Sequence, residues 1–497
     1  MKRLVHSIML LLIVVTVYGQ DISRQDADSM RYALGETKKD IDRIYLLLNL
    51  ARFQIFKPGE NPIDLDSAIV YIKEASALNK TVKSSTAWGY QLLTESFLTK
   101  ERGNKEEGKK MVEKAITILG SGSNKSYLGR AYFELSNYYD YNDSLQLSRR
   151  IALVQQSIDA FQQAGDLKEK GRSLEMIGDL YSETGDFDKT IQVLKQALAV
   201  YDSIKLQSTQ GAYALLGASY LFQGRDYGKA LSYLLESLKT ARLVMDTTIR
   251  LCQINNYIGV LYNEIGRSEM AVKYLADALE VARKYNDEQS IYLLVLNIAS
   301  AYNELDMPAK AIKVLGWLPK KNLLSDDPND KSVIGQCYLG AYILLGQFSR
   351  AQLYSDTLLN VANEKIRDLG RSNIYRLVAS YFFGTKQYSK ARYYLVKSSD
   401  IVKRINRENG RIQNLRLLYK LDSAQGNFQS AYNHLLVYKA KTDSVSSERK
   451  VRQFQVLGVE YEVGMKEDLI KSKDKDIILL TQRNSLQQAN LREASLI

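Results

Sequence analysis

The chain contains 497 residues, of which 45% are hydrophobic, and it carries a formal net charge of +12. It has two histidines, two cysteines and neither a CxxC nor a GxSxG motif, so we expect no enzymatic activity, no metal and no cofactor. The basic residues form no long run, so the charge does not predict a nucleic-acid partner.

Residues 1–19 have the pattern of a secretory signal peptide. Lys2 and Arg3 precede an apolar run from Ile8 to Val15, and Val17 and Gly19 fit the positions before a cleavage site. The apolar run is shorter than the ~20 residues that a membrane-spanning helix needs, which favours cleavage over retention as an anchor. The prediction is an exported protein, periplasmic or associated with the cell envelope.

Residues 20–166 indicate helical pairs with a weak motif. One pair extends from Trp88 to Leu119 with Gly103 at its turn, and another joins residues 127–141 to residues 151–164. The whole chain has only five prolines, which suits long helices because proline lacks the donor N–H of the helical hydrogen bond. We therefore expect degenerate N-terminal helical repeats in this region.

Residues 167–440 contain a clear internal repeat with a period of about 40 residues. The recurring pattern is a small residue, an aromatic residue three positions later, a turn near glycine, a second aromatic residue, an alanine and a leucine, and individual copies depart from it at single positions. The first copy reads GDLYSETGDFDKTIQVL. The copies start at Gly178, Gly217, Gly259, Ala299, Leu339, Ala379 and Tyr419.

The repeat predicts two helices in each copy, joined at the glycine. The turn glycines permit the left-handed backbone conformation that ends a helix, and the alanines let the two helix axes approach closely. Because a single pair cannot bury both of its faces, the copies are expected to stack. The turn glycines are Gly185, Gly224, Gly266, Gly346 and Gly426.

These residues resemble the tetratricopeptide repeat, in a variant with longer helices. The resemblance implies an all-α fold, a right-handed α-α superhelical solenoid, whose first helices line a concave groove for a protein or peptide ligand. Asparagine amides in such a groove could bond a peptide backbone, and arginine or lysine could hold a carboxylate. The alternative is that these side chains are ordinary solvated polar residues. The candidates are Asn256, Asn263, Asn297, Asn303, Asn373, Arg376, Arg416 and Lys420.

Residues 441–497 predict one long helix without the repeat motif. A heptad pattern places Ile470, Ile477, Leu480, Leu491 and Ala494 on one seam, which polar residues interrupt. This pattern is typical of a modest coiled-coil stalk, which would make the chain a homodimer. A solvated helix that caps the solenoid is the alternative.

The order of signal peptide, solenoid and long helix resembles the extracytoplasmic half of bacterial tetratricopeptide sensor histidine kinases. This resemblance implies the ligand-sensing input part of a two-component signal-transduction protein, truncated before its membrane span. Membrane association is expected only if such a span follows. A free-standing exported scaffold that assembles envelope proteins is the second hypothesis, and a cytoplasmic peptide-binding regulator is the third.

Overall fold

The structure is a computed structural model that describes residues 22, 24–37, 40–57, 62–140, 143–246, 248–319, 327–364, 366 and 368–494. Side chains of the last helix are described as far as Met465. The predicted signal peptide of residues 1–19 lies outside the described residues. The seam residues Ile470, Ile477, Leu480, Leu491 and Ala494 lie beyond the last described side chain, so the coiled coil stays a prediction.

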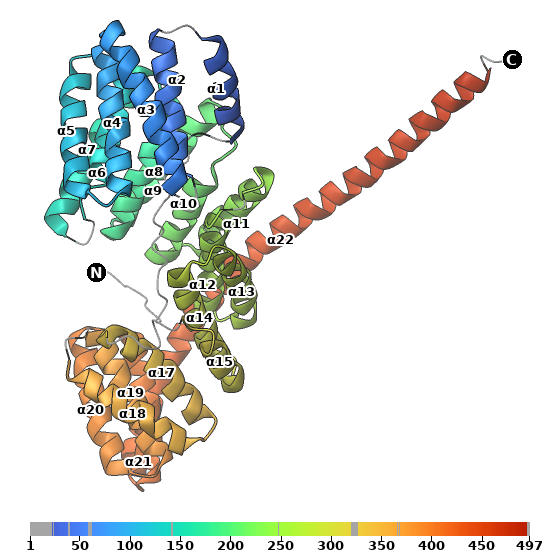
Figure 1. Ribbon diagram of the computed structural model, residues 1–497. Coiled ribbons are helices and arrows are strands. Elements are labelled where there is room, and N and C mark those ends of the chain that lie inside the picture. The colour runs from blue at the N-terminus through green and yellow to red at the C-terminus, as the bar shows by residue number, and fades with distance from the viewer. Residues whose placement is uncertain are drawn as a thin grey trace. The chain divides into compact units, whose positions relative to one another are not determined.

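The described residues form helices and no strands, which confirms the prediction of an all-helical solenoid (Figure 1). Contacts divide the chain into two compact units. The N-terminal unit includes the described residues up to Ser219 and the segment Lys239–Met245, and the C-terminal unit includes Tyr220–Leu238 and the residues from Asp246 onward.

The N-terminal unit begins with α1 (Arg24–Glu36), which is followed by helical pairs. Its helices are α2 (Ile41–Ile55), α3 (Pro62–Val82), α4 (Ser85–Glu101), α5 (Lys105–Gly120), α6 (Lys125–Ser136), α7 (Ser144–Ala164), α8 (Leu167–Glu183) and α9 (Phe187–Ser203). The boundary between the units passes through the next pair, α10 (Gln210–Gln223) and α11 (Tyr227–Leu243).

The C-terminal unit continues with the clearer repeats. Its helices are α12 (Arg250–Glu264), α13 (Ser268–Lys284), α14 (Glu288–Glu304), α15 (Pro308–Leu315), α17 (Pro328–Leu344), α18 (Phe348–Ala362), α19 (Asp368–Gly384), α20 (Tyr388–Arg404), α21 (Glu408–Ala424) and α22 (Phe428–Ala494). The first helices of successive pairs touch one another from α12 through α14, α17 and α19 to α21, so they form a continuous face. We call it the first-helix face.

Small residues let the two helices of a pair approach closely, as the repeat predicted. A Cβ atom added at Gly259 on α12 would lie 2.6 Å from Leu275 Cγ on α13, which is too close for any side chain. A Cβ atom added at Gly178 would lie 2.9 Å from Leu194 Cδ2 in the same way. The alanines of the second helices, such as Ala271 and Ala391, are fully buried.

The turns between paired helices have the predicted left-handed conformation. The φ angles of Gly185, Gly224, Gly266, Gly346 and Gly426 lie between 66° and 78°, which confirms the expected role of these glycines. Two copies place a residue with a side chain at the corresponding turn, and Asp306 and Lys386 have φ angles of 56° and 59°. This conformation is strained for residues other than glycine.

The last helix, α22, extends for 67 residues from the final turn. Its first part is the second helix of the last pair, and it continues without a break through residue 441, where the sequence analysis separated repeat from stalk. Asp422 fixes the turn before it by accepting hydrogen bonds from Ser430 Oγ and Arg392 and by contacting His434 Nδ1 at 2.7 Å. None of the described helices combines the length and apolar character needed to cross a bilayer.

Candidate functional site

Two of the predicted asparagines contact each other on the first-helix face of the C-terminal unit. Asn297 Nδ2 on α14 donates a hydrogen bond of 3.3 Å to Asn256 Oδ1 on α12. Both side chains are buried, with exposed fractions of 0% and 1%. The remaining amide atoms, Asn256 Nδ2 and Asn297 Oδ1, have no hydrogen-bond partner among the described residues. The pair therefore retains one free donor and one free acceptor.

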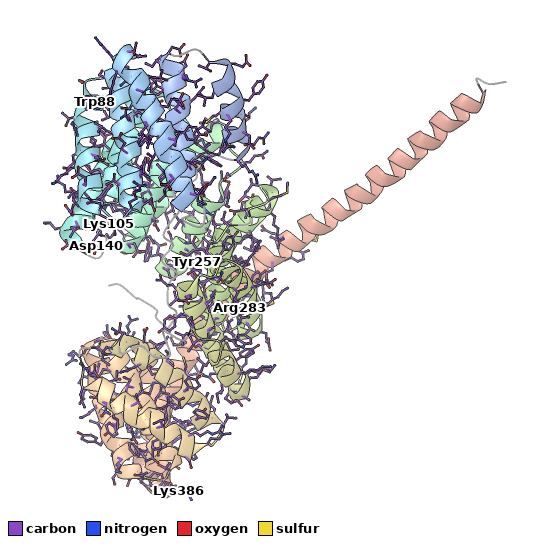
Figure 2. The ribbon with its side chains drawn as sticks, viewed as in Figure 1. Trp88, Lys105, Asp140, Tyr257, Arg283 and Lys386 are labelled. Atoms are coloured by element: carbon purple, nitrogen blue, oxygen red, sulfur yellow. The ribbon has the colours of Figure 1, made fainter. Side chains whose placement is uncertain are left out.

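These asparagines are buried because α12 and α14 are covered on every side. Every residue from Cys252 to Asn263 is buried, and so is every residue from Tyr292 to Ala299. Tyr257, which follows Asn256 and is labelled in Figure 2, accepts a hydrogen bond of 3.0 Å from Gln253 Nε2. A polar group buried without a partner costs about 1–3 kcal/mol, so a water molecule or a ligand that bonds the free atoms of the asparagine pair would lower this cost.

The other two asparagines lie at the carboxyl ends of the same helices. Asn263 Oδ1 accepts a hydrogen bond of 3.1 Å from Ser268 Oγ, which also lies 3.1 Å from Glu304 Oε2. Burial raises the pKa of Glu304, and hydrogen bonds from Ser268 and Asn263 and the charge of Arg449 oppose that rise. Asn303 Oδ1 is buried and has no partner among the described residues.

The four basic or polar candidates of the later repeats lie on α19 and α21. Asn373 and Arg376 are half-buried, whereas Arg416 and Lys420 are exposed. Burial lowers the pKa of Arg376 to about 10, which shows that this guanidinium lies in a poorly solvated position. Helices α19 and α21 touch, but no described contact joins these four side chains to the asparagines.

The sequence analysis missed the partners of Asn263. Glu304 and Ser268 bond to it, and Arg449 of α22 approaches the same group. A signal was present, because the triplet Tyr-Asn-Glu occurs at residues 262–264 and again at residues 302–304, one repeat later. Comparing the two triplets would have drawn attention to the glutamate that follows each asparagine in the sequence.

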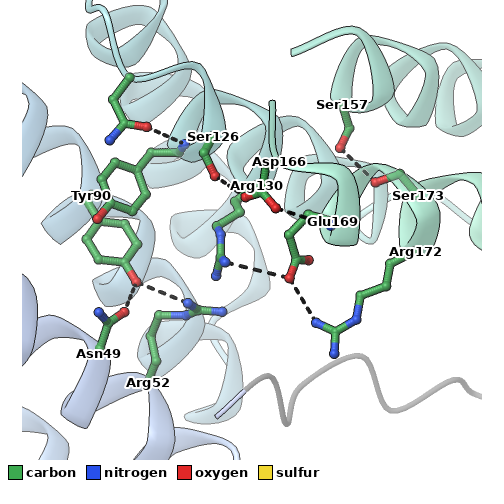
Figure 3. Close-up of polar contacts among 12 residues, drawn as sticks. Asn49, Arg52, Tyr90, Ser126, Arg130, Ser157, Asp166, Glu169, Arg172 and Ser173 are labelled. Carbon is green, nitrogen blue, oxygen red and sulfur yellow. Dashed lines mark hydrogen bonds and ion pairs between the residues drawn. The ribbon is translucent and has the colours of Figure 1, made fainter. Parts of the chain in front are cut away.

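The N-terminal unit contains a different polar cluster, for which the sequence analysis proposed no site (Figure 3). Tyr90 Oη on α4 donates a hydrogen bond of 2.6 Å to Asn49 Oδ1 and accepts one of 3.1 Å from Arg52 Nη1. On α8, Glu169 Oε1 accepts from Arg172 Nη1 at 3.0 Å and pairs with Arg130 Nη2 at 3.7 Å. The cluster connects first helices of the N-terminal unit.

Three tyrosine rings extend this cluster. The ring centroid of Tyr90 lies 4.1 Å from that of Tyr127, and the Tyr127 centroid lies 5.4 Å from that of Tyr45. Burial raises the pKa of Tyr127 well above its ordinary value, so its hydroxyl stays protonated at any physiological pH. The stacked rings and the paired charges indicate a structural role for this part of the first helices.

Comparisons with known proteins agree with the helical-repeat architecture. Residues 98–248 match the family model of the soluble NSF attachment protein, SNAP, and residues 253–285 match a tetratricopeptide repeat model. A search among curated proteins found no match. These partial matches agree with a helical-repeat fold similar to the tetratricopeptide repeat.

The chain is similar to solved helical-repeat structures at low sequence identity. A signal transduction ATPase with numerous domains and a tetratricopeptide repeat sensor, from Pyrococcus horikoshii, is 16% identical with a TM-score of 0.50. The match covers 72% of this chain and 52% of that one, so it spans about half of that protein. A Rap protein complexed with competence and sporulation factor is 15% identical over 76% of this chain and 99% of that one, with a TM-score of 0.46. At 16% identity, the similarity to the Pyrococcus horikoshii protein shows the fold alone.

Proposed function

We propose that the chain is a non-catalytic module that binds a protein or peptide segment on its first-helix face. The observation that carries this proposal is the buried asparagine pair, in which Asn256 keeps a free donor and Asn297 a free acceptor. A residue in an extended segment presents its own N–H and C=O on the same side, so a single residue of a bound segment can satisfy both asparagines.

The later repeats supply positive charge for the same segment. Arg376 has no acidic partner among the described residues, and burial makes its charge costly, so an anion beside it would relieve that cost. Arg416 and Lys420 on the next first helix add exposed positive charge. A carboxylate of the bound segment, at its end or on a side chain, suits this part of the face.

The setting that we propose comes from the sequence. The signal-peptide pattern supports export to the periplasm or envelope, and the long helix after the repeats supports the input part of a sensor protein. A free-standing exported scaffold is the second candidate, favoured by the return of α22 onto the solenoid through the contact between Glu460 and Arg267. To test export, the full chain is expressed in a bacterium that secretes proteins, and the N-terminus of the purified protein is identified by mass spectrometry. A protein that still begins at Met1 would contradict export.

The binding proposal is tested with a pool of synthetic peptides and the full chain. Peptides retained by the wild-type chain are identified by mass spectrometry, and the double variant N256A/N297A is then probed with the same pool. We expect the retained peptides to be lost, because each needs the free amide atoms of the pair. The matched control is N433A, since Asn433 is an exposed asparagine on α22. Equal retention by wild type and N256A/N297A would contradict the proposed site.

A further inference from the structure

The middle of α22 lies against helices that precede it by several repeats. Glu460 accepts hydrogen bonds from Arg267 Nη1, with distances of 2.7 and 2.6 Å to its two carboxylate oxygens, and one of 2.7 Å from Tyr262 Oη. Tyr262 lies in the last turn of α12 and Arg267 lies in the connection between α12 and α13, and they precede Glu460 by 198 and 193 residues. The side chains of Glu460 and Arg267 are 25% and 33% exposed, so water reaches the ion pair.

Further contacts fix the register of this segment. Gln453 Nε2 donates a hydrogen bond of 2.8 Å to the carbonyl oxygen of Ile265, and Gln455 Oε1 accepts one of 3.2 Å from the Tyr227 backbone N–H. Arg452 lies over the Tyr227 ring at 4.9 Å from its centroid. The contacts follow one side of α22, from Arg449 to Glu460. We call residues 449–460 the latch. We call the residues that receive the latch the turn edge, and they are Tyr227, Gly228, Tyr262, Ile265, Gly266 and Arg267.

The latch needs close approach to the backbone of the turn edge. A Cβ atom added at Gly266 would lie 3.1 Å from Arg449 Cδ, and one added at Gly228 would lie 3.1 Å from the carbonyl oxygen of Gln455. Val456, between these contacts, is fully buried. Glycine at both places therefore lets α22 seat directly on the turns, which makes the turn edge a specific surface for a helix.

The latch changes the mechanics of the solenoid. In a repeat array each pair contacts its neighbours only, so small rotations between pairs add up along the chain. A contact between α22 and the α12–α13 turn ties the last pair to one several repeats earlier. The rotations of the intervening pairs are then no longer independent, and the spacing of their first helices is fixed.

The latch is connected to the candidate site through Arg449. The charge of Arg449 acts on Glu304, which bonds to Ser268 and Asn263. The same first helices, α12 and α14, are buried on every side and hold the asparagine pair. A segment of another protein reaches Asn256 and Asn297 only after these helices separate from what covers them.

We propose that the turn edge of α11–α13 is a helix-binding surface occupied by this chain's own residues 449–460, and that this latch holds the first-helix face closed. Its release lets α12 and α14, with the asparagine pair intact, separate from the residues that cover them and admits the ligand. The access step rests on the proposed function, whereas the latch itself does not. The contacts are mainly polar and partly hydrated, so they exchange with water more readily than an apolar interface does.

Limited trypsin digestion of the full chain tests the latch. Arg449, Lys450 and Arg452 are cleavage sites within it, and docking on the turn edge protects them. The variant E460Q keeps the shape of the side chain but removes the charge that Arg267 binds, so we expect cleavage there to be about three- to tenfold faster. The matched control is E462Q, because Glu462 is an exposed residue two positions away.

Two comparisons separate release from unfolding. Cleavage after Lys195 on α9 serves as an internal reference, and it should not change in E460Q. The charge reversals E460R and R267E should each speed cleavage in the latch, and the combined variant should restore protection if the two residues pair directly. Cleavage of E460Q no faster than E462Q, or no recovery in the combined variant, would overturn the latch.

Hydrogen exchange tests the access step without a ligand. Amides of α12 and α14 should exchange faster in E460Q than in wild type and E462Q, because the first helices are no longer held together. If α22 is released but α12 and α14 exchange at the wild-type rate, the latch does not control access and that step is wrong. Because neither experiment uses a peptide, failure of peptide binding counts against the proposed function alone.

Discussion

The first helices of the two units carry polar residues in contrasting arrangements. In the N-terminal unit, Tyr90 is held between Asn49 and Arg52, and Glu169 takes two arginines. In the C-terminal unit, Asn256 and Asn297 share one hydrogen bond and keep a donor and an acceptor unused. Hydrogen bonds between side chains offset the cost of burying them, whereas a buried group without a partner reduces stability until water or a ligand bonds it.

The largest expected effect concerns Tyr90, the fully buried centre of the N-terminal cluster. Truncating it in Y90A removes the ring that stacks on Tyr127 and leaves a cavity, at a cost of about 4 kcal/mol in the free energy of unfolding. The variant Y90F removes only the hydroxyl, so Asn49 and Arg52 each lose a hydrogen bond. We expect this to lower the free energy of unfolding by about 1–2 kcal/mol. Urea unfolding followed by circular dichroism measures both.

The control for Tyr90 is Tyr32 on α1, which is 78% exposed. The variant Y32A should change stability by less than about 0.5 kcal/mol, because an exposed ring loses little on truncation. A Y90F protein as stable as wild type would show that the N-terminal network is not structural, and the contrast between the two units would disappear.

The next largest effect is expected at Asp422, a buried group of the C-terminal unit that has hydrogen-bond partners, unlike the free atoms of the asparagine pair. Asp422 is buried, with its side chain 1% exposed, and its partner Arg392 is 35% exposed. Burial by itself would raise the pKa of Asp422, but hydrogen bonds from Ser430, Arg392 and His434 outweigh it, so the pKa lies below the ordinary value. The variant R392A should cost about 2 kcal/mol, less than a fully buried ion pair, because Arg392 is partly solvated.

The sign of the pH dependence follows from the lowered pKa of Asp422. Its contribution is present above the unfolded pKa of about 3.9 and is lost as pH falls through the folded value. R392A should therefore differ most from wild type at neutral pH and least in strong acid, as measured by thermal unfolding across pH. The control R411A removes a pair that is 44% and 46% exposed and should have almost no effect. A constant difference at all pH values would contradict this assignment.

A smaller effect, of opposite sign, is expected at the asparagine pair. Replacing both residues with leucine in N256L/N297L removes two buried groups that are only half satisfied, so stability should stay the same or rise by up to about 1 kcal/mol. The single variant N297L leaves Asn256 without its partner and should cost about 1–2 kcal/mol. If the double variant is clearly less stable than wild type, the pair is structural and the unused atoms are not binding capacity.

Some features of this fold follow from the sequence because short-range geometry determines them. The turn at Gly266 needs a left-handed residue, and that conformation recurs at Gly185, Gly224, Asp306, Gly346, Lys386 and Gly426. The close crossing at Gly259 needs a small residue, which recurs at Gly178.

The polar partnerships could not be predicted in the same way. Glu460 meets Arg267 only because the rotations of the intervening pairs bring α22 back to the α12–α13 turn. No local pattern encodes a sum of small rotations, so the sequence left a capping helix and a stalk as alternatives. The pairing of Asn256 with Asn297 also depends on the offset of adjacent first helices, since the two residues are 41 apart and the repeat period is about 40.

The smallest effect tests the part of the fold that backbone geometry controls. Lys386 occupies a turn with a φ angle of 59°, where its neighbouring copies have glycine. The variant K386G should relieve about 1 kcal/mol of backbone strain and lose part of that gain to the greater freedom of glycine in the unfolded chain, for a net gain of about 0.5 kcal/mol. The reverse change, G426A, should cost about 1 kcal/mol, because Gly426 has a φ angle of 78° and open space around it, so only the backbone conformation resists a side chain. Thermal unfolding of the two variants measures both effects. If K386G were destabilising, Lys386 would be making a contact whose stabilising effect exceeds the backbone strain. The lysine would then stabilise the fold through a side-chain partner, as the paired polar groups of the N-terminal unit do.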